Sequence, residues 1–356
     1  MTRSQESSPS GLATPLASNL VGKTINGWIV EKKLPKSIDT TGGAFSSGYV
    51  VRNRDNGTKA FLKAINIAYA VQMFGTSVNR TDLINQITED FKYERDLLKF
   101  CGESKMDRVV IAIDSGEYVE PTDPYFIPYL VFELCEQGDI RRHRRMSHPG
   151  LAWRLRIFHG VCVGLRQLHS KDVVHQDLKP SNVLVFEEEK SKIADLGRSS
   201  RKGTKSDTPD HCGDVGYMPI ELQYSYFDPD WNIRRKGADL YMLGCLFAFL
   251  AANVHIFGLI LGKLPDSQHP RNWRGTYADV LPAVRTATYD AISEIAATLP
   301  EPLREGASNL LQWLCDPEPA RRGHPTTRTQ LRGDHYSLER IISAADLLAS
   351  RAKFLK

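Results

Sequence analysis

The feature that most restricts the fold is a long run without a formal charge, LYMLGCLFAFLAANVHIFGLILG, at residues 240–262. A run of this length can span a bilayer. However, Asn253 and His255 fall inside it, and Gly244 and Gly258 interrupt it. A buried central helix followed by a second helix explains the run as well. It therefore predicts either a membrane span or the core of a large globular domain.

The composition is that of a globular chain. The 356 residues are 41% hydrophobic and 25% charged, enough for a substantial core in one large domain or two lobes. The formal net charge of +4 is too mild to indicate a nucleic-acid partner, and residues 1–19 lack the apolar core of a secretory signal. Without a CxxC pair, the cysteines are expected to be reduced thiols in a cytosolic protein. They are Cys101, Cys135, Cys162, Cys212, Cys245 and Cys315.

A small β-rich half precedes a larger helical half. Residues 1–20, rich in Ser, Pro and small residues, are predicted to be disordered. Residues 27–132 are strand-like with one helix, and helical periodicity dominates the rest. The expected elements are a hairpin turning at Asp55-Asn56-Gly57, a strand at 128–135, helices at 85–101, 151–169, 238–252, 282–298 and 303–314, and an amphipathic tail at 337–354.

The stretch VVHQDLKPSNVLVF, residues 173–186, places several polar residues between two apolar runs. It follows a long helix and precedes a short hairpin, so its polar residues lie on a loop held by core elements. Asn182 and Asp195 carry the oxygen atoms that Mg²⁺ prefers when it bridges phosphates. Asp177 can accept a hydroxyl proton, and Lys179 can neutralise charge on a transferring phosphoryl group. The stretch predicts phosphoryl transfer; the alternative is a polar hairpin loop with ordinary capping residues.

Several motifs resemble those of protein kinases. HQDLKPSN resembles the catalytic loop of that family, and ADLG resembles its DFG motif. TGGAFSSGYVV looks like the glycine-rich loop over ATP, with Gly43, Gly48 and Val50 in the pattern and Phe45 at the middle glycine position, although this loop signal is weak by itself. AFLKA resembles the VAIK strand, which implies that Lys63 holds the α- and β-phosphates.

The lysine of this family pairs with a helix glutamate, for which Glu89 and Glu94 compete. Residues five apart point about 140° apart on a helix, so only one of them can face Lys63. FKYERDLL resembles the ExxxL pattern of the family and favours Glu94. The alternative for either glutamate is a solvated helix face.

LVFELCEQGDI looks like the hinge between the two lobes. The resemblance implies that Phe132 guards the back of the nucleotide pocket and that the Glu133 carbonyl and Cys135 amide read the adenine edge. Asp139 falls where the family often has an acid that binds the ribose hydroxyls. The alternative for Asp139 is a helix N-cap.

GDVGYMPIEL resembles the end of the activation segment. The resemblance implies that Glu221 pairs with an arginine in DPEPARRGHP, where Arg321 and Arg322 are both candidates and Arg322 is slightly favoured. GADLYMLGCLF resembles the central helix of the family, in which Asp239 holds the backbone of the catalytic loop. This resemblance favours a buried helix over a membrane span for the uncharged run.

The chain departs from the family pattern at several positions. Gln176 replaces the arginine that receives a phosphate on the activation loop, so activation by that route is not expected. Phe61 stands where a small alanine faces adenine, and a ring there would crowd the base. Asp214 stands where serine/threonine kinases have threonine, and its carboxylate would either repel Asp177 or pair with Lys179.

Two further regions carry predictions. The basic loop GRSSRKGTKSDTP is expected to be autophosphorylated, with a flexible solvated loop as the alternative. Its candidate residues are Ser199, Ser200, Thr204, Ser206 and Thr208. The C-terminal amphipathic helix is expected to pack on the helical lobe, although a partner or a membrane surface could also take it.

We therefore predict an α+β, two-lobed protein-kinase-like fold, with a small β-rich N-terminal lobe containing one main helix and a larger, mostly helical C-terminal lobe. The predicted boundaries are a disordered segment at 1–20, a kinase domain at 21–336 and a C-terminal amphipathic helix at 337–356. Within the kinase domain, the lobes are expected at about 21–133 and 134–336.

The resemblance implies a serine/threonine protein kinase that uses ATP and Mg²⁺, since a lysine two residues after the catalytic aspartate is the choice of that group. Asp177 and Lys179 would be catalytic, and Asn182 and Asp195 would hold the metal. The alternatives are a pseudokinase that acts as a nucleotide-dependent or scaffold binding module, and a small-molecule kinase. We expect a protein substrate with Ser or Thr, a cytoplasmic location, no nucleic-acid partner and no stable membrane insertion. The divergence fits a bacterial member of the family, and the oligomeric state stays open.

Overall fold

A computed structural model describes residues 16–35, 45–75, 77–120, 124–146, 149–186, 190–204 and 213–355. The chain divides into two compact units. The first comprises Met1–Lys99 and Ile111–Leu134, and the second comprises Phe100–Val110 and Cys135–Lys356. The boundaries predicted for the kinase domain and its lobes stay predictions.

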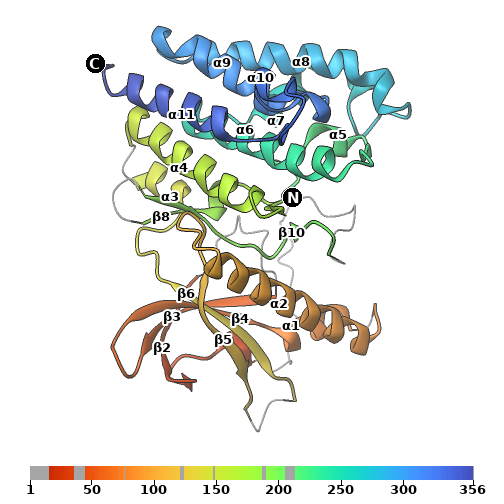
Figure 1. Cartoon of the computed structure of the whole chain (residues 1–356). Helices are drawn as coiled ribbons and strands as arrows, with labels where there is room; N and C mark the ends of the chain where they lie inside the picture. The colour runs from red at the N-terminus through yellow and green to blue at the C-terminus, as the bar shows by residue number, and fades with distance from the viewer. Residues whose placement is uncertain are drawn as a thin grey trace, which may run out of the picture. The chain divides into compact units, whose positions relative to one another are not determined.

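The described part of the first unit is built on a six-stranded antiparallel sheet in the order β1-β2-β3-β4-β6-β5 (Figure 1). Side chains alternate between its faces: Ala60, Leu62 and Ala64 are buried on one face of β4, whereas Phe61 and Lys63 point to the other. The strands are β1 (Thr24–Ile25), β2 (Trp28–Lys33), β3 (Ser46–Asn53), β4 (Lys59–Ile65), β5 (Ala112–Tyr118) and β6 (Ile127–Glu133).

The core of this unit lies on the Leu62 face, where the chain before β1 covers it. Leu16–Ser18 form a short 3-10 turn, η1, with Ala17 and Leu20 buried against the sheet. The hydroxyl of Tyr49 on β3 donates to the Ala17 carbonyl at 2.8 Å. This corrects the prediction of disorder for residues 1–20 in its last part, because apolar side chains there complete the core; residues 1–15 lie outside the described residues.

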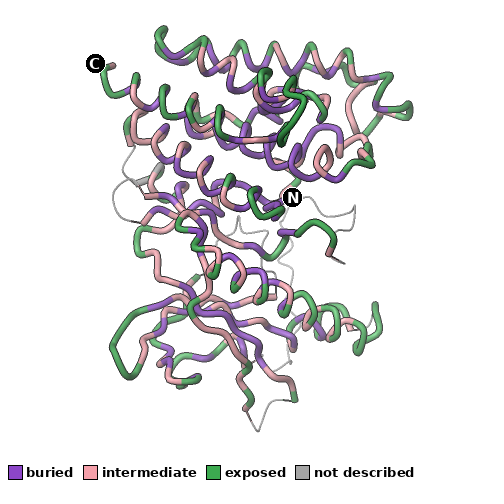
Figure 2. Tube along the Cα trace, viewed as in Figure 1, coloured by how far each residue is buried: buried purple, intermediate pink, exposed green. Residues whose placement is uncertain are grey.

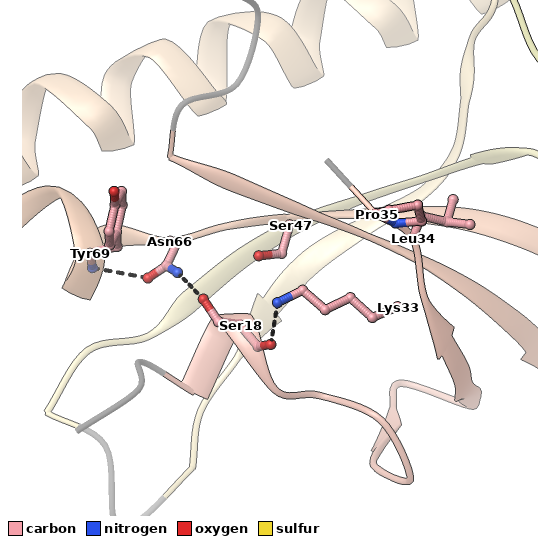
Figure 3. A pocket seen from close by; sticks show the side chains of 7 residues that line it. All are labelled: Ser18, Lys33, Leu34, Pro35, Ser47, Asn66 and Tyr69. Atoms are coloured by element: carbon pink, nitrogen blue, oxygen red, sulfur yellow. Dashed lines mark hydrogen bonds between the residues drawn. The ribbon is translucent and has the colours of Figure 1, made fainter. Parts of the chain in front are cut away.

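An open pocket of about 520 Å³ lies between this segment and the sheet (Figure 3). Ser18 bonds to two other lining residues: its carbonyl accepts from Lys33 Nζ at 2.6 Å, and its hydroxyl accepts from Asn66 Nδ2 at 2.8 Å. The pocket is lined by Ser18, Lys33, Leu34, Pro35, Ser47, Asn66 and Tyr69.

The sheet is accompanied by the one main helix predicted and by a short second helix. α2 (Arg80–Glu103) contains the predicted 85–101 helix and extends it at both ends. α1 (Ile67–Phe74) was not predicted. It begins directly after β4 because Asn66 is its N-cap, with the side-chain Oδ1 accepting from the Tyr69 backbone N–H at 2.9 Å.

The second unit is mostly helical. Its long helices are α4 (Leu151–His169), α6 (Gly237–Ala252), α8 (Tyr277–Ala297), α9 (Glu301–Cys315) and α11 (Glu339–Ala352). The shorter ones are α3 (Ile140–Met146), α5 (Ile220–Gln223), α7 (Ile256–Lys263) and α10 (Pro325–Arg328), with 3-10 turns η2 (Pro180–Asn182), η4 (Asp266–Gln268) and η5 (Pro319–Arg321) and a π-helical turn η3 (Asn232–Lys236). Short strands form two antiparallel pairs: β7 (Val173–Val174) with β10 (Ser200–Arg201), and β8 (Val183–Val185) with β9 (Ser191–Ile193).

α6 is the central helix of this unit, buried continuously from Gly237 to Ala248 (Figure 2). It ends at Asn253, whose left-handed backbone allows the chain to turn into α7. Among the described residues, no single helix is long and apolar enough to cross a membrane. Residues 232–252 and 256–263, which are bent by 100° to each other, reach that length and composition only as a pair.

Two helices near the C-terminus add detail to the predicted pattern. α8 begins at Tyr277, ahead of the predicted Pro282, because Thr276 and Asp279 form a capping box that starts the helix earlier. α11 packs along α4 (Figure 1). Its charged residues are exposed, and Ile341, Ala345 and Leu348 are among its buried side chains.

Candidate active site

The loop that contains Asp177 is fastened to the start of α6. The backbone N–H groups of His175 and Gln176 donate to the two carboxylate oxygens of Asp239, each at 2.8 Å. Gln176 has a left-handed backbone with φ of 63°, which costs about 1–2 kcal/mol for a residue other than glycine. The hydrogen bonds to Asp239 offset this cost, so they fix a loop conformation that the chain would not adopt alone.

Asp239 is fully buried, and its charge is compensated from several sides. Burial alone would raise the pKa of Asp239, but the hydrogen bond and charge of His169, the charge of His175 and the Gln176 N–H together lower that pKa. His169 Nε2, at the end of α4, lies 2.8 Å from Asp239 Oδ2 and carries the proton it donates. The carboxylate is therefore held ionised as an acceptor for the loop.

His175 joins the two chain segments that carry the predicted chemistry. Its Nδ1 accepts from the Asp177 backbone N–H at 3.2 Å, and its Nε2, which then holds the proton, lies 3.1 Å from the Ala194 carbonyl. Asp195 follows directly after Ala194. The sequence predicts no role for His175, because its side chain contacts a residue almost twenty positions away.

Asp177 lies within a compact group of polar side chains. Its Oδ2 is 3.0 Å from Lys179 Nζ and accepts from Asn182 Nδ2 at 3.1 Å. The same Asn182 nitrogen donates to the Asp177 carbonyl at 2.8 Å. All three side chains are buried. The arrangement places one carboxylate beside one ammonium group. The carboxylate is suited to receive a proton, and the ammonium is suited to stabilise negative charge.

Residues 213 and 214 lie against the same carboxylate. The Asp214 backbone N–H donates to Asp177 Oδ1 at 3.1 Å, and a Cβ on Gly213 would lie only 2.2 Å from that oxygen. The Asp214 side chain approaches Lys179 Nζ at 3.8 Å and accepts from the Gly216 N–H at 2.9 Å. Of the two outcomes expected for Asp214, the structure shows the pairing with Lys179, since the ammonium lies between both carboxylates.

Asn182 and Asp195 flank the open end of the β8–β9 hairpin. Val183 pairs with Ile193, and the Ala194 N–H donates to the Asn182 carbonyl at 2.8 Å. Because the Asn182 nitrogen is used by Asp177, its Oδ1 is the atom suited to a cation. Among the described residues, no group of three or more His, Cys, Asp or Glu side chains converges as a metal site. One amide and one carboxylate oxygen fit Mg²⁺ that takes further ligands from phosphates.

The first unit contains the second predicted group. Lys63 Nζ lies 2.8 and 3.1 Å from the two carboxylate oxygens of Glu94, and both side chains are largely buried. Glu89 instead pairs with Lys92 on the exposed side of α2. The structure thus brings together the lysine and the glutamate that the sequence favoured. Their role in nucleotide binding stays a prediction.

The sheet face that carries Lys63 also carries the end of the glycine-rich stretch. In the β3–β4 register, Gly48 pairs with Lys63 and Val50 with Phe61. The Phe61 ring lies next to Gly48, and its centroid is 6.1 Å from the centroid of the Phe132 ring. Gly43, the other predicted loop glycine, lies outside the described residues.

The predicted hinge residues have local partners. Glu133 is the last residue of β6, and the thiol of Cys135 donates to the Val185 carbonyl at 3.0 Å. Asp139 caps α3 through the Arg141 N–H at 2.8 Å and forms an ion pair with the Arg141 guanidinium at 2.8 Å. The N-cap alternative for Asp139 is therefore present in the structure, and a ribose contact would compete with Arg141. The described cysteines are free thiols.

Glu221 forms a bidentate ion pair with Arg322 at 2.8 and 2.5 Å, and both residues are buried. Burial opposes the charge of Arg322, but the Glu221 carboxylate outweighs burial and raises the pKa of Arg322. Arg321, the competing candidate, lies 3.5 Å from Asp316. The pair joins α5 to the residue that follows η5.

The loop predicted to be autophosphorylated is only partly described. Ser199 and Ser200 are buried, and the Ser199 hydroxyl donates to the His175 carbonyl at 3.2 Å. Thr204 donates to the Arg201 carbonyl at 2.7 Å. Burial disfavours Ser199 and Ser200 as modification sites. Ser206 and Thr208 lie outside the described residues.

A sheet-based unit with a lysine–glutamate pair and a helical unit with an Asp-Lys-Asn loop are the parts expected of a protein kinase domain. The model of the protein kinase domain family matches residues 42–332. The chain belongs to this family, and the predicted family and two-lobed α+β fold class are confirmed.

The curated relatives include several eukaryotic kinases. The chain is 26% identical over 251 residues to serine/threonine-protein kinase atg1 of Dictyostelium discoideum, covering 68% of this chain and 33% of the relative. It is 27% identical over 277 residues to mitosis inhibitor protein kinase wee1 of Schizosaccharomyces pombe, covering 73% and 27%. For Aurora kinase of Debaryomyces hansenii the identity is 24% over 197 residues, covering 54% and 41%. The chain therefore spans less than half the length of these relatives.

Proposed function

We propose that this chain is an ATP-dependent serine/threonine protein kinase that transfers the γ-phosphate to a hydroxyl group of a protein. The observation that carries this proposal is the Asp177 carboxylate, held by Asn182 and paired with Lys179 at 3.0 Å. A carboxylate so placed can orient a hydroxyl group and accept its proton. The adjacent ammonium can stabilise charge on the phosphoryl group as it moves.

The remaining residues would bind the nucleotide and metal. Lys63, fixed by Glu94, would contact the α- and β-phosphates, and Gly48 and Val50 would border them. Asn182 and Asp195 would hold Mg²⁺, which supplies positive charge to the phosphates when bound. The Glu133 carbonyl and the Cys135 amide would contact the adenine edge. Asp139 would reach the ribose only by leaving Arg141.

A pseudokinase is the second candidate, favoured by one specific observation. Both carboxylate oxygens of Asp177 already accept hydrogen bonds within the chain, from Asp214 N–H on one side and from Asn182 and Lys179 on the other. A hydroxyl substrate would have to share or displace one of these contacts. If it cannot, the fold would bind nucleotide without turnover and act through a partner.

The experiment is transfer of labelled γ-phosphate from ATP with Mg²⁺, to the chain itself and to a generic basic protein. Asp177→Ala should lower the rate on the order of a hundredfold or more. Asp290→Ala, at an exposed position of α8, is the matched control and should keep the wild-type rate. Analysis of the labelled residues distinguishes Ser and Thr from Tyr, and a parallel assay with small hydroxyl compounds tests the small-molecule alternative. ATP binding without transfer by the wild type would favour the pseudokinase.

A further inference from the structure

Gln176 and Arg235 form a reciprocal side-chain pair beneath the Asp177 loop. The Gln176 side-chain Nε2 lies 3.0 Å from the Arg235 carbonyl and 3.0 Å from Asp239 Oδ1. In return, Arg235 Nη1 donates to Gln176 Oε1 at 3.0 Å. Gln176 has no exposed surface, and Arg235 is 2% exposed. The residue immediately before Asp177 is thus joined to the chain that enters α6.

The π-helical turn η3 places Arg235 at this position. A π-turn inserts an extra residue into the helical repeat and so redirects the side chains that follow it. Two successive cations of η3, Arg235 and Lys236, are both buried. Lys236 Nζ contacts Asp334 at 2.7 Å and Asp172 at 3.4 Å. Asp172 directly precedes β7, so η3 is tied to both ends of the segment that leads to Asp177.

The chemistry at position 176 requires a neutral side chain that both donates and accepts. Asp239 offers only acceptor oxygens, and the Arg235 guanidinium offers only donors. An arginine at position 176 would bring a second guanidinium against Arg235, and a carboxylate would face Asp239. Glutamine satisfies both neighbours with a single amide, and its length spans the gap between them.

The backbone of Gln176 has a strained conformation and forms hydrogen bonds to two other segments of the chain. The left-handed φ of Gln176 is stabilised by its N–H bond to Asp239, and its carbonyl accepts from the Gly213 N–H at 2.9 Å. A shift of Gln176 would therefore move Asp177, which follows it, and would loosen residue 213, which lies against the Asp177 carboxylate.

We propose that Gln176 is a positioning residue for Asp177, and that its bridge to Arg235 holds the catalytic loop in place from within the fold. In this kinase the guanidinium comes from η3, while the loop itself supplies a neutral partner. The catalytic part of this inference rests on the proposed kinase function. The structural part, that the bridge orders residues 175–177, does not.

The test compares Gln176→Met, which keeps the length but loses all three side-chain hydrogen bonds, with Gln176→Arg, Arg235→Gln and the double swap. Gln312→Met, at an exposed position of α9, is the matched control. One readout is hydrogen exchange of the amides of residues 175–177 in the full chain. The other is steady-state phosphate transfer, with kcat and the KM for ATP determined separately.

Gln176→Met and Gln176→Arg should speed exchange at residues 175–177 and lower kcat about tenfold or more, with the KM for ATP within about twofold, because the loop is misplaced while the Lys63–Glu94 pair is intact. The double variant Gln176→Arg/Arg235→Gln should recover most of kcat. Its arginine at position 176 would face Asp239, and its glutamine at position 235 would face that arginine. A residue needed only for folding would instead lower the melting temperature without rescue by the swap.

Unchanged exchange and unchanged kcat in Gln176→Met would overturn the proposal. If the wild type shows no transfer, the kinase function fails, and the exchange data still decide whether the bridge orders the loop. Gln176→Asn adds a check: asparagine tolerates the left-handed backbone but is too short to reach Arg235, so it should behave like Gln176→Met.

Discussion

The ring of Phe61 fills the space that a side chain on Gly48 would need. A Cβ built on Gly48 would lie 2.7 Å from Phe61 Cε2, closer than such atoms approach in proteins. The two residues lie on neighbouring strands, on the sheet face that also carries Lys63. The glycine is thus required by an aromatic neighbour, in addition to any need for close approach by a phosphate.

Gly48→Ala should destabilise the chain by about 1–3 kcal/mol, because the added methyl group overpacks the contact with Phe61. Phe61→Ala in the same chain removes the opposing ring and should recover much of the loss. Urea unfolding of both variants measures the effect. Equal destabilisation by Gly48→Ala with and without the Phe61 ring would show that the contact is not the cause.

Glu94→Gln should lower kcat/KM for ATP about tenfold or more, since the partly buried Lys63 ammonium would lose its charged partner and its fixed position. Glu89→Gln is the matched control, because Glu89 pairs with Lys92 on the exposed side of α2. Rates of phosphate transfer at varied ATP concentrations give kcat/KM for both variants and test the prediction. A loss of equal size in both would mean that Glu94 has no special role.

Removing one partner of the Glu221–Arg322 pair should cost about 3–5 kcal/mol of unfolding free energy, because the other charge stays buried and uncompensated. Arg322→Met tests this by chemical denaturation. Arg321→Met provides the control, since the Arg321 side chain is 47% exposed. Adding Glu221→Leu to Arg322→Met should restore part of the stability; no recovery in the double variant would contradict the charge argument.

Leu348→Ala should destabilise the chain by about 2–5 kcal/mol, because Leu348 is buried in α11 and lies against Gly306 of α9. Its neighbour Leu347 is 51% exposed, so Leu347→Ala should change stability by less than about 0.5 kcal/mol. Thermal or urea unfolding distinguishes the two. If both variants matched the wild type, the packing of α11 on the second unit would not stabilise the fold.

Acidification should destabilise the chain partly through His159 on α4. Burial lowers the pKa of His159 below its ordinary value of 6.5; Asp346 opposes this shift, and Arg156 adds to it. The unfolded chain therefore takes up the proton first. Above about pH 6.5, His159 contributes nothing to the pH dependence of the unfolding free energy. As the pH falls from there toward the pKa of His159 in the folded chain, protonation of the unfolded state lowers that free energy. The melting temperature of His159→Gln should fall less than that of the wild type between about pH 7.5 and 5.5; an identical fall would remove His159 from the explanation.

Local sequence signals predicted much of the fold. The spacing of apolar residues placed α4 at its observed ends and α6 within one residue, because these helices bury strongly patterned faces. α1 was not predicted because the sequence marks its start by a single N-cap residue, Asn66, at the end of a strand. Leu16 to Leu20 were predicted to be disordered, since a short apolar segment gains its stability only from the sheet it covers.

The sequence by itself determined the residue types of the candidate site: Asp177, Lys179, Asn182 and Asp195 in order along one loop and hairpin, and Lys63 with two glutamates to choose from. Motif spacing contains this information, because neighbours in the chain stay neighbours in space. The tertiary structure decided which long-range partners these residues have. Arg235 beneath Gln176 comes from a segment tens of residues away, and its placement depends on how the chain packs where it enters α6, which no local pattern encodes. For Asp214, which the resemblance had placed near Asp177, the structure decided in favour of pairing with Lys179.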